Sequence, residues 1–431
     1  MRVGDIWIDR NLRDTPFFHQ ALDPSRDTSY PIDLFVGRAD EANEILADVL
    51  GTSSSRSAVQ GSPGVGKTSL ASFIKERAGR EGIGSRARFV SLGHQARSED
   101  VLLDILGYVY QVVLANGDIS TEALNAVRTA RQILEVQENR NLSASVGIPT
   151  MGSVGGGTSV SYSTPPSAIR FQAPLLVEQL LRLAKEHCGL SGILLHLNNL
   201  DNLAAQDIER AGLVLRDLRD WCLMLPDLHV LVVGTDYAVQ NVIGAHPQLR
   251  TVFTSIARIQ PLALAEVESL LEKRYAFLRI SPEEPVPLLV TSEALGEIYR
   301  LFRGDLRGVF QALHRGILRL TLRKGLSPRA PAELGPLIEV LADLYRGEVT
   351  REMGTSGMES LKRLAAAVGK ETFTQAEVRK RLKMNANSAS EFVRTLLKFE
   401  FAVLGERVPE GPGRPRERYL LSGAARLAAL D

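Results

Sequence analysis

In the first two thirds of the chain, short apolar runs alternate with longer stretches in which apolar residues recur at helical spacing. Short apolar runs bounded by polar or glycine residues cover 57–60, 88–92, 192–201, 228–236 and 257–262. Between them, apolar residues recur every three or four positions, which indicates amphipathic helices. The helix expected over 98–115 begins at Ser98 as its N-cap. Strands that alternate with helices at this spacing predict an α/β fold, a parallel sheet with helices on both faces.

From residue 263 onward the pattern changes to helices and then to a hairpin. Helical periodicity covers 266–275, 293–302 and 306–322, then 337–344 and 357–368. A capping box, Thr374 with Glu377, opens a short helix to Leu382, and a second helix covers 388–399. Two strand-like runs, 401–404 and 418–421, flank a charged tip rich in Gly and Pro. Helix, helix, turn, helix and hairpin in this order predict a C-terminal winged-helix domain.

One stretch, residues 142–167, fits neither pattern. It holds no charged residue and alternates small polar with apolar residues around Gly155, Gly156 and Gly157. A β-hairpin that protrudes to touch DNA or a neighbouring subunit fits this alternation, although the absence of Lys and Arg disfavours DNA. A disordered Gly/Ser linker fits equally well.

Composition narrows the class of protein. The 431 residues are enough for two or three domains, and the apolar fraction of 44% is typical of a soluble globular protein. No apolar run approaches the ~20 residues that span a bilayer, and the first residues lack the apolar core of a signal peptide. Cys188 and Cys222 are too few for a disulfide framework. We therefore expect a cytoplasmic protein with reduced cysteines.

Charge is distributed unevenly along the chain. Residues 356–431 carry 14 Lys and Arg against nine Asp and Glu, a net +5, whereas the remainder is −4. A basic C-terminal segment on a mildly acidic body favours an anionic partner such as double-stranded DNA, with a solvated surface as the plain alternative.

The most specific motif matches G-x-x-x-x-G-K-[ST], the phosphate-binding loop, and it lies between a strand-like run and a helical run. Its residues are Gly61, Ser62, Pro63, Gly64, Val65, Gly66, Lys67 and Thr68. Glycines let the backbone N–H groups curl around phosphate oxygens, and the helix N-terminus adds positive potential. Lys67 would reach the β- and γ-phosphates of ATP, and the Thr68 hydroxyl would ligate Mg²⁺.

Two later apolar runs end in polar residues, Asn198, Asn199 and Asp201 after the first, Thr235 and Asp236 after the second. Ligands of parallel sheets bind at the carboxyl ends of the strands, so these side chains are expected to converge with the phosphate loop. His196 lies on the other side of its strand from Asn199 if the alternation holds, and we interpret it as a buried histidine with its hydrogen bonds satisfied.

The winged-helix region offers candidate DNA contacts. In a helix-turn-helix the N-terminal end of the second helix enters the major groove, and basic residues at the wing bind the backbone. The candidates are Lys383, Asn385, Asn387, Ser388, Arg394, Arg414, Arg416 and Arg418.

The order of these parts resembles the AAA+ ATPases, and most closely their origin-recognition/initiator-type clade. The resemblance covers 34–325 and 356–431. It implies that Val36, Gly37 and Arg38 lie beside the adenine and that Ser69 joins the phosphate loop in binding ATP. It further implies that Asp236, or alternatively Thr235, is the sensor-1 residue and that Arg307 is the sensor-2 arginine reaching the γ-phosphate. Arg250 would be an arginine finger for a neighbouring subunit, with Arg258 as runner-up.

One departure from the family is chemically important. The family ends its Walker B strand in Asp-Glu, whereas the matching residues here are Asn198, expected to face Mg²⁺, and Asn199, in place of the catalytic glutamate. An amide has an acceptor oxygen but no negative charge and takes no proton. General-base assistance is worth ~10²–10⁴ in rate, so we expect ATP binding with slow hydrolysis, partly compensated by Asp201.

The expected organisation is an N-terminal strap (1–33), a nucleotide-binding core (34–262), a helical lid (263–325), a linker (326–355) and a winged helix (356–431). The resemblance implies a homo-oligomer in the ATP-bound state. Three functions remain open at this point. The first is an ATP-controlled protein that assembles on duplex DNA, in replication initiation, transposition or a mobile-element or defence role. The second is a STAND-like signalling ATPase without DNA binding, and the third is an ordinary ATPase motor with fast turnover.

Overall fold

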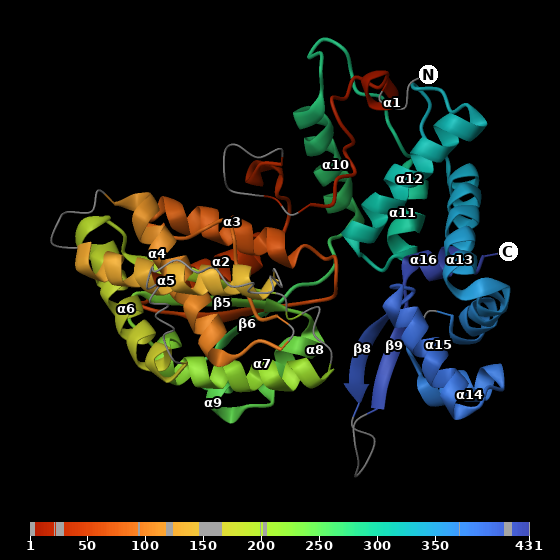
Figure 1. Ribbon diagram of the computed structural model, residues 1–431. Coiled ribbons are helices and arrows are strands. Elements are labelled where there is room, and N and C mark those ends of the chain that lie inside the picture. Colours follow the sequence, from red (N-terminus) through yellow and green to blue (C-terminus); the bar gives the residue numbers. More distant parts are fainter. Residues whose placement is uncertain are drawn as a thin grey trace, which may run out of the picture.

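A computed structural model describes residues 5–20, 22, 30–93, 95–117, 124–145, 166–198, 200, 205–369, 371–408 and 416–430. The chain forms two lobes (Figure 1). One lobe holds a sheet between layers of helices, and the other joins a helical unit to a small C-terminal unit with its own sheet. No described helix has both the length and the apolar character needed to cross a membrane.

The large sheet is parallel in every described pairing, with strand order β2-β4-β5-β1-β6. Its strands are β1 (Arg56–Gln60), β2 (Ile83–Gly84), β4 (Gly192–Asn198), β5 (Leu228–Gly234) and β6 (Ser255–Arg258), and β3 (Val90–Ser91) pairs with β4. Gln60, Gly234 and Arg258 stand level with one another, so the carboxyl ends of β1, β5 and β6 share one edge. The predicted parallel sheet is confirmed.

Two of the predicted strands differ in extent. The strand expected over 88–92 is only the two residues of β3, and Phe89 is 38% exposed. The strand expected over 257–262 is β6, which begins earlier and ends at Arg258. Pro261 has no backbone N–H to donate, so the ladder does not continue through it.

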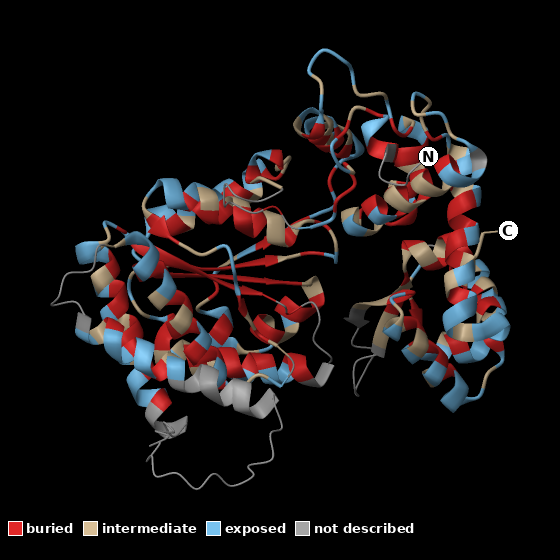
Figure 2. Cartoon of the chain, turned by 45° about the horizontal axis from the view of Figure 1, so that its top comes forward, coloured by how far each residue is buried: buried red, intermediate tan, exposed pale blue. Residues whose placement is uncertain are grey.

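Helices cover both faces of the sheet, as predicted (Figure 2). Apolar side chains of α2 (Ala39–Gly51) and α3 (Lys67–Arg80) pack with β1 and β5 on one face. The second face is covered by apolar side chains of α4 (Ser98–Asn116), α5 (Leu124–Ser145), α6 (Pro166–His187) and α7 (Ala205–Leu218). Short turns of helix complete the core: η3 (Arg219–Leu223), α8 (Asp236–Val239), η4 (Gln240–Gly244) and α9 (Pro247–Arg250).

Two predictions differ from the structure, the N-cap of α4 and the conformation of the uncharged stretch 142–167. Arg97, not Ser98, is the N-cap of α4, because the Ser98 hydroxyl donates to Asp217 Oδ2 at 2.7 Å. Residues 142–145 belong to α5 and residues 166–167 to α6, so the ends of the uncharged stretch are helical instead of strand or linker. Its middle, 146–165, lies outside the described residues.

The helical lid consists of α10 (Leu264–Leu278), α11 (Ser292–Leu301) and α12 (Leu306–Lys324). The N-terminal strap, with α1 (Asp5–Ile8) and η1 (Ile32–Leu34), packs into the same apolar core. Arg274 of α10 is 5% exposed and donates to the backbone oxygens of Pro16 at 3.0 Å and Phe18 at 2.7 Å. Its guanidinium also lies over the Phe18 ring, so this buried charge holds strap and lid together.

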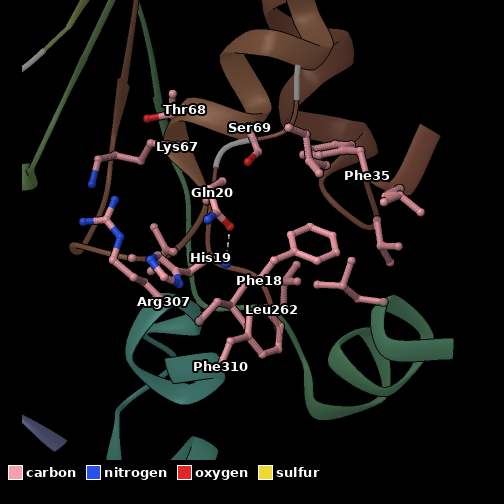
Figure 3. A pocket seen from close by; sticks show the side chains of 18 of the residues that line it. Phe18, His19, Gln20, Phe35, Lys67, Thr68, Ser69, Leu262, Arg307 and Phe310 are labelled. Carbon is pink, nitrogen blue, oxygen red and sulfur yellow. Dashed lines mark hydrogen bonds between the residues drawn. The ribbon is translucent and has the colours of Figure 1, made fainter. Parts of the chain in front are cut away.

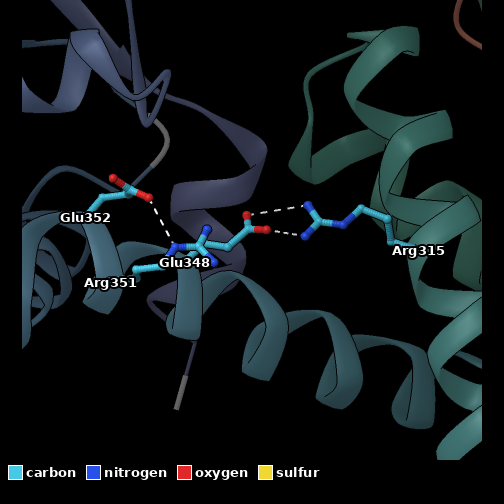
Figure 4. A network of polar contacts seen from close by, with 4 residues as sticks. All are labelled: Arg315, Glu348, Arg351 and Glu352. Carbon is cyan, nitrogen blue, oxygen red and sulfur yellow. Dashed lines mark hydrogen bonds and ion pairs between the residues drawn. The ribbon is translucent and has the colours of Figure 1, made fainter.

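Beyond the lid, one long helix leads to the C-terminal unit. The helix α13 (Leu334–Val368) has non-helical angles only at Gly354 (φ 73°, ψ 175°), where it kinks, so the helix expected over 337–344 is longer than predicted. Arg315 of α12 binds both carboxylate oxygens of Glu348 on α13 (Figure 4). This bidentate pair joins the lid to the first part of α13.

The C-terminal unit contains β7 (Phe373–Thr374), α14 (Gln375–Leu382), α15 (Ala386–Lys398), β8 (Ala402–Val408), β9 (Arg416–Leu421) and α16 (Gly423–Ala428). The small sheet has the order β7-β9-β8 and is antiparallel. The capping box is confirmed, because Glu377 N donates to Thr374 Oγ1 and Thr374 N donates to Glu377 Oε2. The helices and hairpin thus occur in the order predicted from the sequence, and the hairpin tip lies outside the described residues.

Two histidines of the large sheet, His196 and His229, are buried. His196 on β4 is 1% exposed, and neither ring nitrogen forms a hydrogen bond with any residue that the structure describes, so the prediction of a satisfied histidine is wrong. Burial and the nearby Lys75 ammonium hold the pKa of His196 well below its usual value. Burial lowers the pKa of His229 on β5 to about 4, with Arg56 adding to the shift.

We expect folding stability to fall as the pH drops below about 6.5, the pKa of an unfolded histidine. Both folded pKa values are depressed, so the unfolded chain takes up protons first. Each histidine should remove about 1.4 kcal/mol of unfolding free energy per pH unit, measured by urea unfolding between pH 7.5 and 5.5. His187→Gln, on an exposed position, should keep the slope. A flat profile would contradict the assignment.

Candidate functional site

The phosphate-loop motif connects β1 directly to α3. Gly64 (φ 74°) and Gly66 (φ 97°) adopt left-handed backbone angles, and Gly66 is the N-cap of α3. Only glycine takes these angles without strain, which explains the residue type at both positions. Lys67 opens the helix, so the free N–H groups and positive end of α3 face the loop.

Lys67 lies across the inside of this loop. Its side chain is buried, and Nζ donates to the carbonyl oxygens of Gly61 at 3.0 Å and Ser62 at 2.9 Å. Phosphate oxygens are stronger acceptors than neutral carbonyls, so a bound polyphosphate would compete well for this ammonium.

One cavity combines the loop with three other parts of the chain (Figure 3). The sequence-predicted residues in its lining are Val36, Arg38, Gly64, Val65, Gly66, Lys67, Thr68, Ser69 and Arg307. The side chains of Lys67, Thr68 and Ser69 come from α3, and those of Arg307 and Phe310 come from the lid helix α12. The structure therefore brings the predicted phosphate loop and the predicted sensor arginine to one cavity.

Two residues of the predicted adenine segment are in contact with the loop and the lid. Arg38 is 7% exposed, and its Nη2 donates to the Val65 carbonyl oxygen at 2.6 Å. Burial lowers the pKa of Arg38. Gly37 (φ 72°) lies against Glu266 and Leu262, so close that a Cβ there would stand 2.6 Å from Glu266 Oε1.

The strap supplies cavity residues that the sequence reasoning missed. Phe18, His19 and Gln20 lie between the lid and the start of α3 (Figure 3). The only sequence signal was the pair of aromatic residues Phe17 and Phe18, which indicates burial but not its location. The strap thus closes the side of the cavity on which the lid lies.

The lid also touches the phosphate loop directly. The Leu306 N–H donates to the Gly64 carbonyl oxygen at 3.2 Å, and Asp305 lies directly beside Gly64. Asp305 is the N-cap of α12 and accepts from Gly308 N at 3.1 Å. Burial is the main reason that the pKa of Asp305 is raised. The lid and loop are therefore in direct contact through backbone and side chain.

The residues that follow the other strands lie farther from the loop. Asn198 ends β4 and is 7% exposed, and β5 separates β4 from β1, so Asn198 lies about 10 Å across the sheet from the end of β1. Asn199 and Asp201 lie outside the described residues. Asp236 begins α8 and pairs with Arg258 Nε at 2.9 Å. Arg250, at the end of α9, is exposed and is absent from the cavity lining.

Thr68 and Asn198 were predicted to face Mg²⁺, and both offer neutral oxygen donors. The described residues contain no group of three or more His, Cys, Asp or Glu side chains that would hold a metal by themselves. Mg²⁺ commonly binds substrate phosphates and water and needs few protein ligands, so a threonine hydroxyl beside a phosphate loop fits it.

The predicted DNA-contact residues share one unit but differ in their availability. Lys383, Asn385, Asn387, Ser388 and Arg394 are all exposed. Asn385 is already used as the N-cap of α15, where its Oδ1 accepts from Ser388 N at 2.8 Å. Arg418 Nη1 donates to Thr372 Oγ1 at 3.3 Å. Arg414 lies outside the described residues, and only the backbone of Arg416 is described.

No protein-family model and no curated protein matches the chain. Three of the solved structures that resemble it are as follows. The ORC2 protein of Aeropyrum pernix, with ADPNP and ADP, has 16% identity and a TM-score of 0.45 over 96% of this chain and 95% of that one. The ORC1 protein of the same organism, in complex with DNA, has 14% identity and a TM-score of 0.42 over 92% of each chain. The Thermotoga maritima RuvB Holliday junction branch migration motor has 15% identity and a TM-score of 0.41 over 90% and 93%. These similarities are too weak to assign a family, so the site rests on the geometry above.

Proposed function

We propose that the chain is an AAA+ protein that binds ATP with Mg²⁺ and uses it to control its conformation or assembly on duplex DNA. The observation that carries the proposal is the shared cavity of the phosphate loop and the lid. Lys67 and the N-terminus of α3 supply positive charge for the phosphates, and Arg307 reaches the same cavity from a separate unit. A γ-phosphate held between them would fix the lid relative to the core.

Within this proposal, each group has one task. Lys67 neutralises the β- and γ-phosphates, Thr68 and Asn198 face Mg²⁺, and Mg²⁺ supplies charge neutralisation between the phosphates when bound. Arg38 keeps the loop in place through Val65. Arg250 is proposed to act on the site of a neighbouring copy. Arg258, the runner-up, is paired with Asp236 within its own chain, which favours Arg250 for this role.

Arg307→Ala should weaken ATP binding about tenfold or more and change ADP binding less than twofold. A charge-assisted hydrogen bond to phosphate is worth roughly 1.5–3 kcal/mol, and only ATP has the γ-phosphate. Titration calorimetry with both nucleotides measures the difference. Arg323→Ala, an exposed arginine of the same helix, is the matched control. Equal losses for ATP and ADP would remove Arg307 from the γ-phosphate.

We propose that hydrolysis is slow because Asn199 stands where the family has its catalytic glutamate. Asn199→Glu should then raise a very low steady-state ATP turnover by roughly 10²–10⁴, the usual worth of a general base. Asn199→Gln keeps the amide and serves as the control. Fast turnover in the unchanged protein would end this interpretation.

The DNA part of the proposal rests on the C-terminal unit. Its exposed candidates lie on α15 and in the turn between α14 and α15, and the hairpin β8–β9 follows directly. The test is fluorescence anisotropy with a labelled duplex at 50 and 200 mM salt. Phosphate contacts predict steep weakening with salt, and charge reversal at Lys383 and Arg394 should reduce the affinity at least tenfold.

The second candidate is a nucleotide-gated oligomerisation switch without DNA. It is favoured by one observation, that the C-terminal unit packs back on the rest of the chain, with β8 beside α8 and α16 beside α11 and α13. Absence of duplex binding at 50 mM salt, together with an ATP-dependent change of mass in light scattering, would select this candidate.

A further inference from the structure

The nucleotide cavity contains a histidine of the strap that serves no other residue. His19 lines the cavity together with Lys67 of α3 and Arg307 of α12 (Figure 3). His19 is exposed, and its backbone N–H donates to Gln20 Oε1 at 3.2 Å. Neither ring nitrogen forms a hydrogen bond with any residue that the structure describes. The imidazole is therefore available to a ligand in the cavity.

The strap holds His19 against the lid. Phe18, the preceding residue, is buried, and its carbonyl oxygen accepts from Arg274 of α10 at 2.7 Å. Burial lowers the pKa of His314 on α12, and repulsion from His19 contributes to this shift. His19 therefore lies close to α12, the helix that carries Arg307 in its first turn.

The charges around His19 favour an anion as the ligand. None of the described residues that line the cavity is an Asp or a Glu. The charged side chains in this lining are Arg38, Lys67, Arg274 and Arg307. Arg38 and Arg274 already donate to backbone carbonyl oxygens, which leaves Lys67 and Arg307 as the cations that a ligand would meet with His19. On the side of His314, the further charged groups are Asp14 of the strap and Arg315 of α12.

An imidazole binds phosphate well in only one of its protonation states. In the charged form both ring nitrogens are donors, and a charged donor forms the stronger hydrogen bond to a phosphate oxygen. The imidazole is also the side chain whose charge ordinarily changes near neutral pH. A neighbouring anion favours the charged form, so anion binding and proton uptake by a histidine are coupled.

We propose that His19, in its protonated form, binds the nucleotide phosphate that lies nearest Arg307, and that the affinity for ATP therefore depends on pH. This inference rests on the proposed function, because it needs ATP in this cavity. It adds a phosphate ligand that belongs to neither the phosphate loop nor the lid. Since the strap is fastened to the lid through Arg274, a nucleotide bound by His19 would hold strap and lid closed together.

The test is titration calorimetry of the full chain with ATP and Mg²⁺ at pH 6.5 and 8.5. We expect the unchanged protein to lose affinity about fivefold or more at the higher pH, because a charged hydrogen bond to phosphate is worth about tenfold or more. His19→Gln should bind ATP more weakly at pH 6.5 and change less than about twofold between the two conditions. His19→Arg keeps a positive charge at both pH values, so it should retain the tighter binding at pH 8.5.

Proton uptake on binding gives a readout that a merely structural role of His19 would not change. Calorimetry at pH 7.5 in two buffers of different ionisation enthalpy measures it. ATP binding to the unchanged protein should take up a fraction of a proton more than binding to His19→Gln, which controls for protonation of ATP itself. His187→Gln, on an exposed position of α6, should behave like the unchanged protein.

Equal pH dependence and equal proton uptake in His19→Gln and the unchanged protein would overturn the role of His19 and leave the nucleotide site intact. Absence of ATP binding to the unchanged protein at both pH values would instead refute the nucleotide site, and the role of His19 with it.

Discussion

Replacing Lys67 by alanine should lower the affinity for ATP at least 100-fold. Lys67 is the only lysine in the described lining of the nucleotide cavity, and its ammonium is already held inside the loop by Gly61 and Ser62. Two charge-assisted hydrogen bonds to phosphate oxygens, together worth about 3 kcal/mol or more, correspond to this factor. Calorimetry or a fluorescent ATP analogue measures it.

The control for this experiment is Lys185→Ala, since Lys185 is exposed and pairs with Asp227 at 3.0 Å. Its ATP affinity should stay within twofold of the unchanged protein. The Lys67→Ala protein should also keep its salt-dependent affinity for duplex DNA in the absence of nucleotide. Unchanged ATP affinity in the folded Lys67→Ala protein would refute the nucleotide site altogether.

Gly64→Ala should destabilise the protein by about 2–5 kcal/mol and abolish nucleotide binding. A Cβ on Gly64 would stand 1.6 Å from Asp305 Oδ1 and 3.3 Å from the Asp305 Cα, so the lid turn itself must shift. The positive φ of 74° adds about 1–2 kcal/mol of backbone strain for any residue other than glycine. Displacing a packed group adds about 1–3 kcal/mol. Urea unfolding measures the sum.

Gly66→Ala separates the two contributions. Gly66 also has a positive φ, 97°, but apart from its own chain neighbours no atom of the described residues lies within 4 Å of a Cβ built there. It should therefore cost only the strain, about 1–2 kcal/mol. A further Asp305→Ala change should recover part of the loss in Gly64→Ala and none in Gly66→Ala. Equal costs for the two glycine variants would show that the lid does not press on the loop in solution.

The parts of the fold that follow from local patterns could be predicted from the sequence. The strands β4 and β5 are mostly apolar and buried along their whole length, and the capping box of α14 depends on two residues three positions apart. The phosphate loop is equally local, because its backbone angles require glycine at fixed spacings.

Features that depend on distant contacts could not be predicted. Nothing in the local pattern indicates that Ser98 binds Asp217, or that the strap residues His19 and Gln20 reach the nucleotide cavity. His196 is similar: alternation predicts its burial, but not that its ring nitrogens form no hydrogen bond with the residues that the structure describes.

The pair between Arg315 and Glu348 has a mechanical consequence. It fastens α12 to α13, so a rotation of the lid would carry with it the part of α13 that precedes Gly354. That part is about 20 residues long, which makes a lever arm of about 30 Å. A lid rotation of only about 10° would move its far end by about 5 Å. Gly354 is the single non-helical residue in this helix. Such a displacement would be transmitted to the C-terminal unit through the kink at this residue.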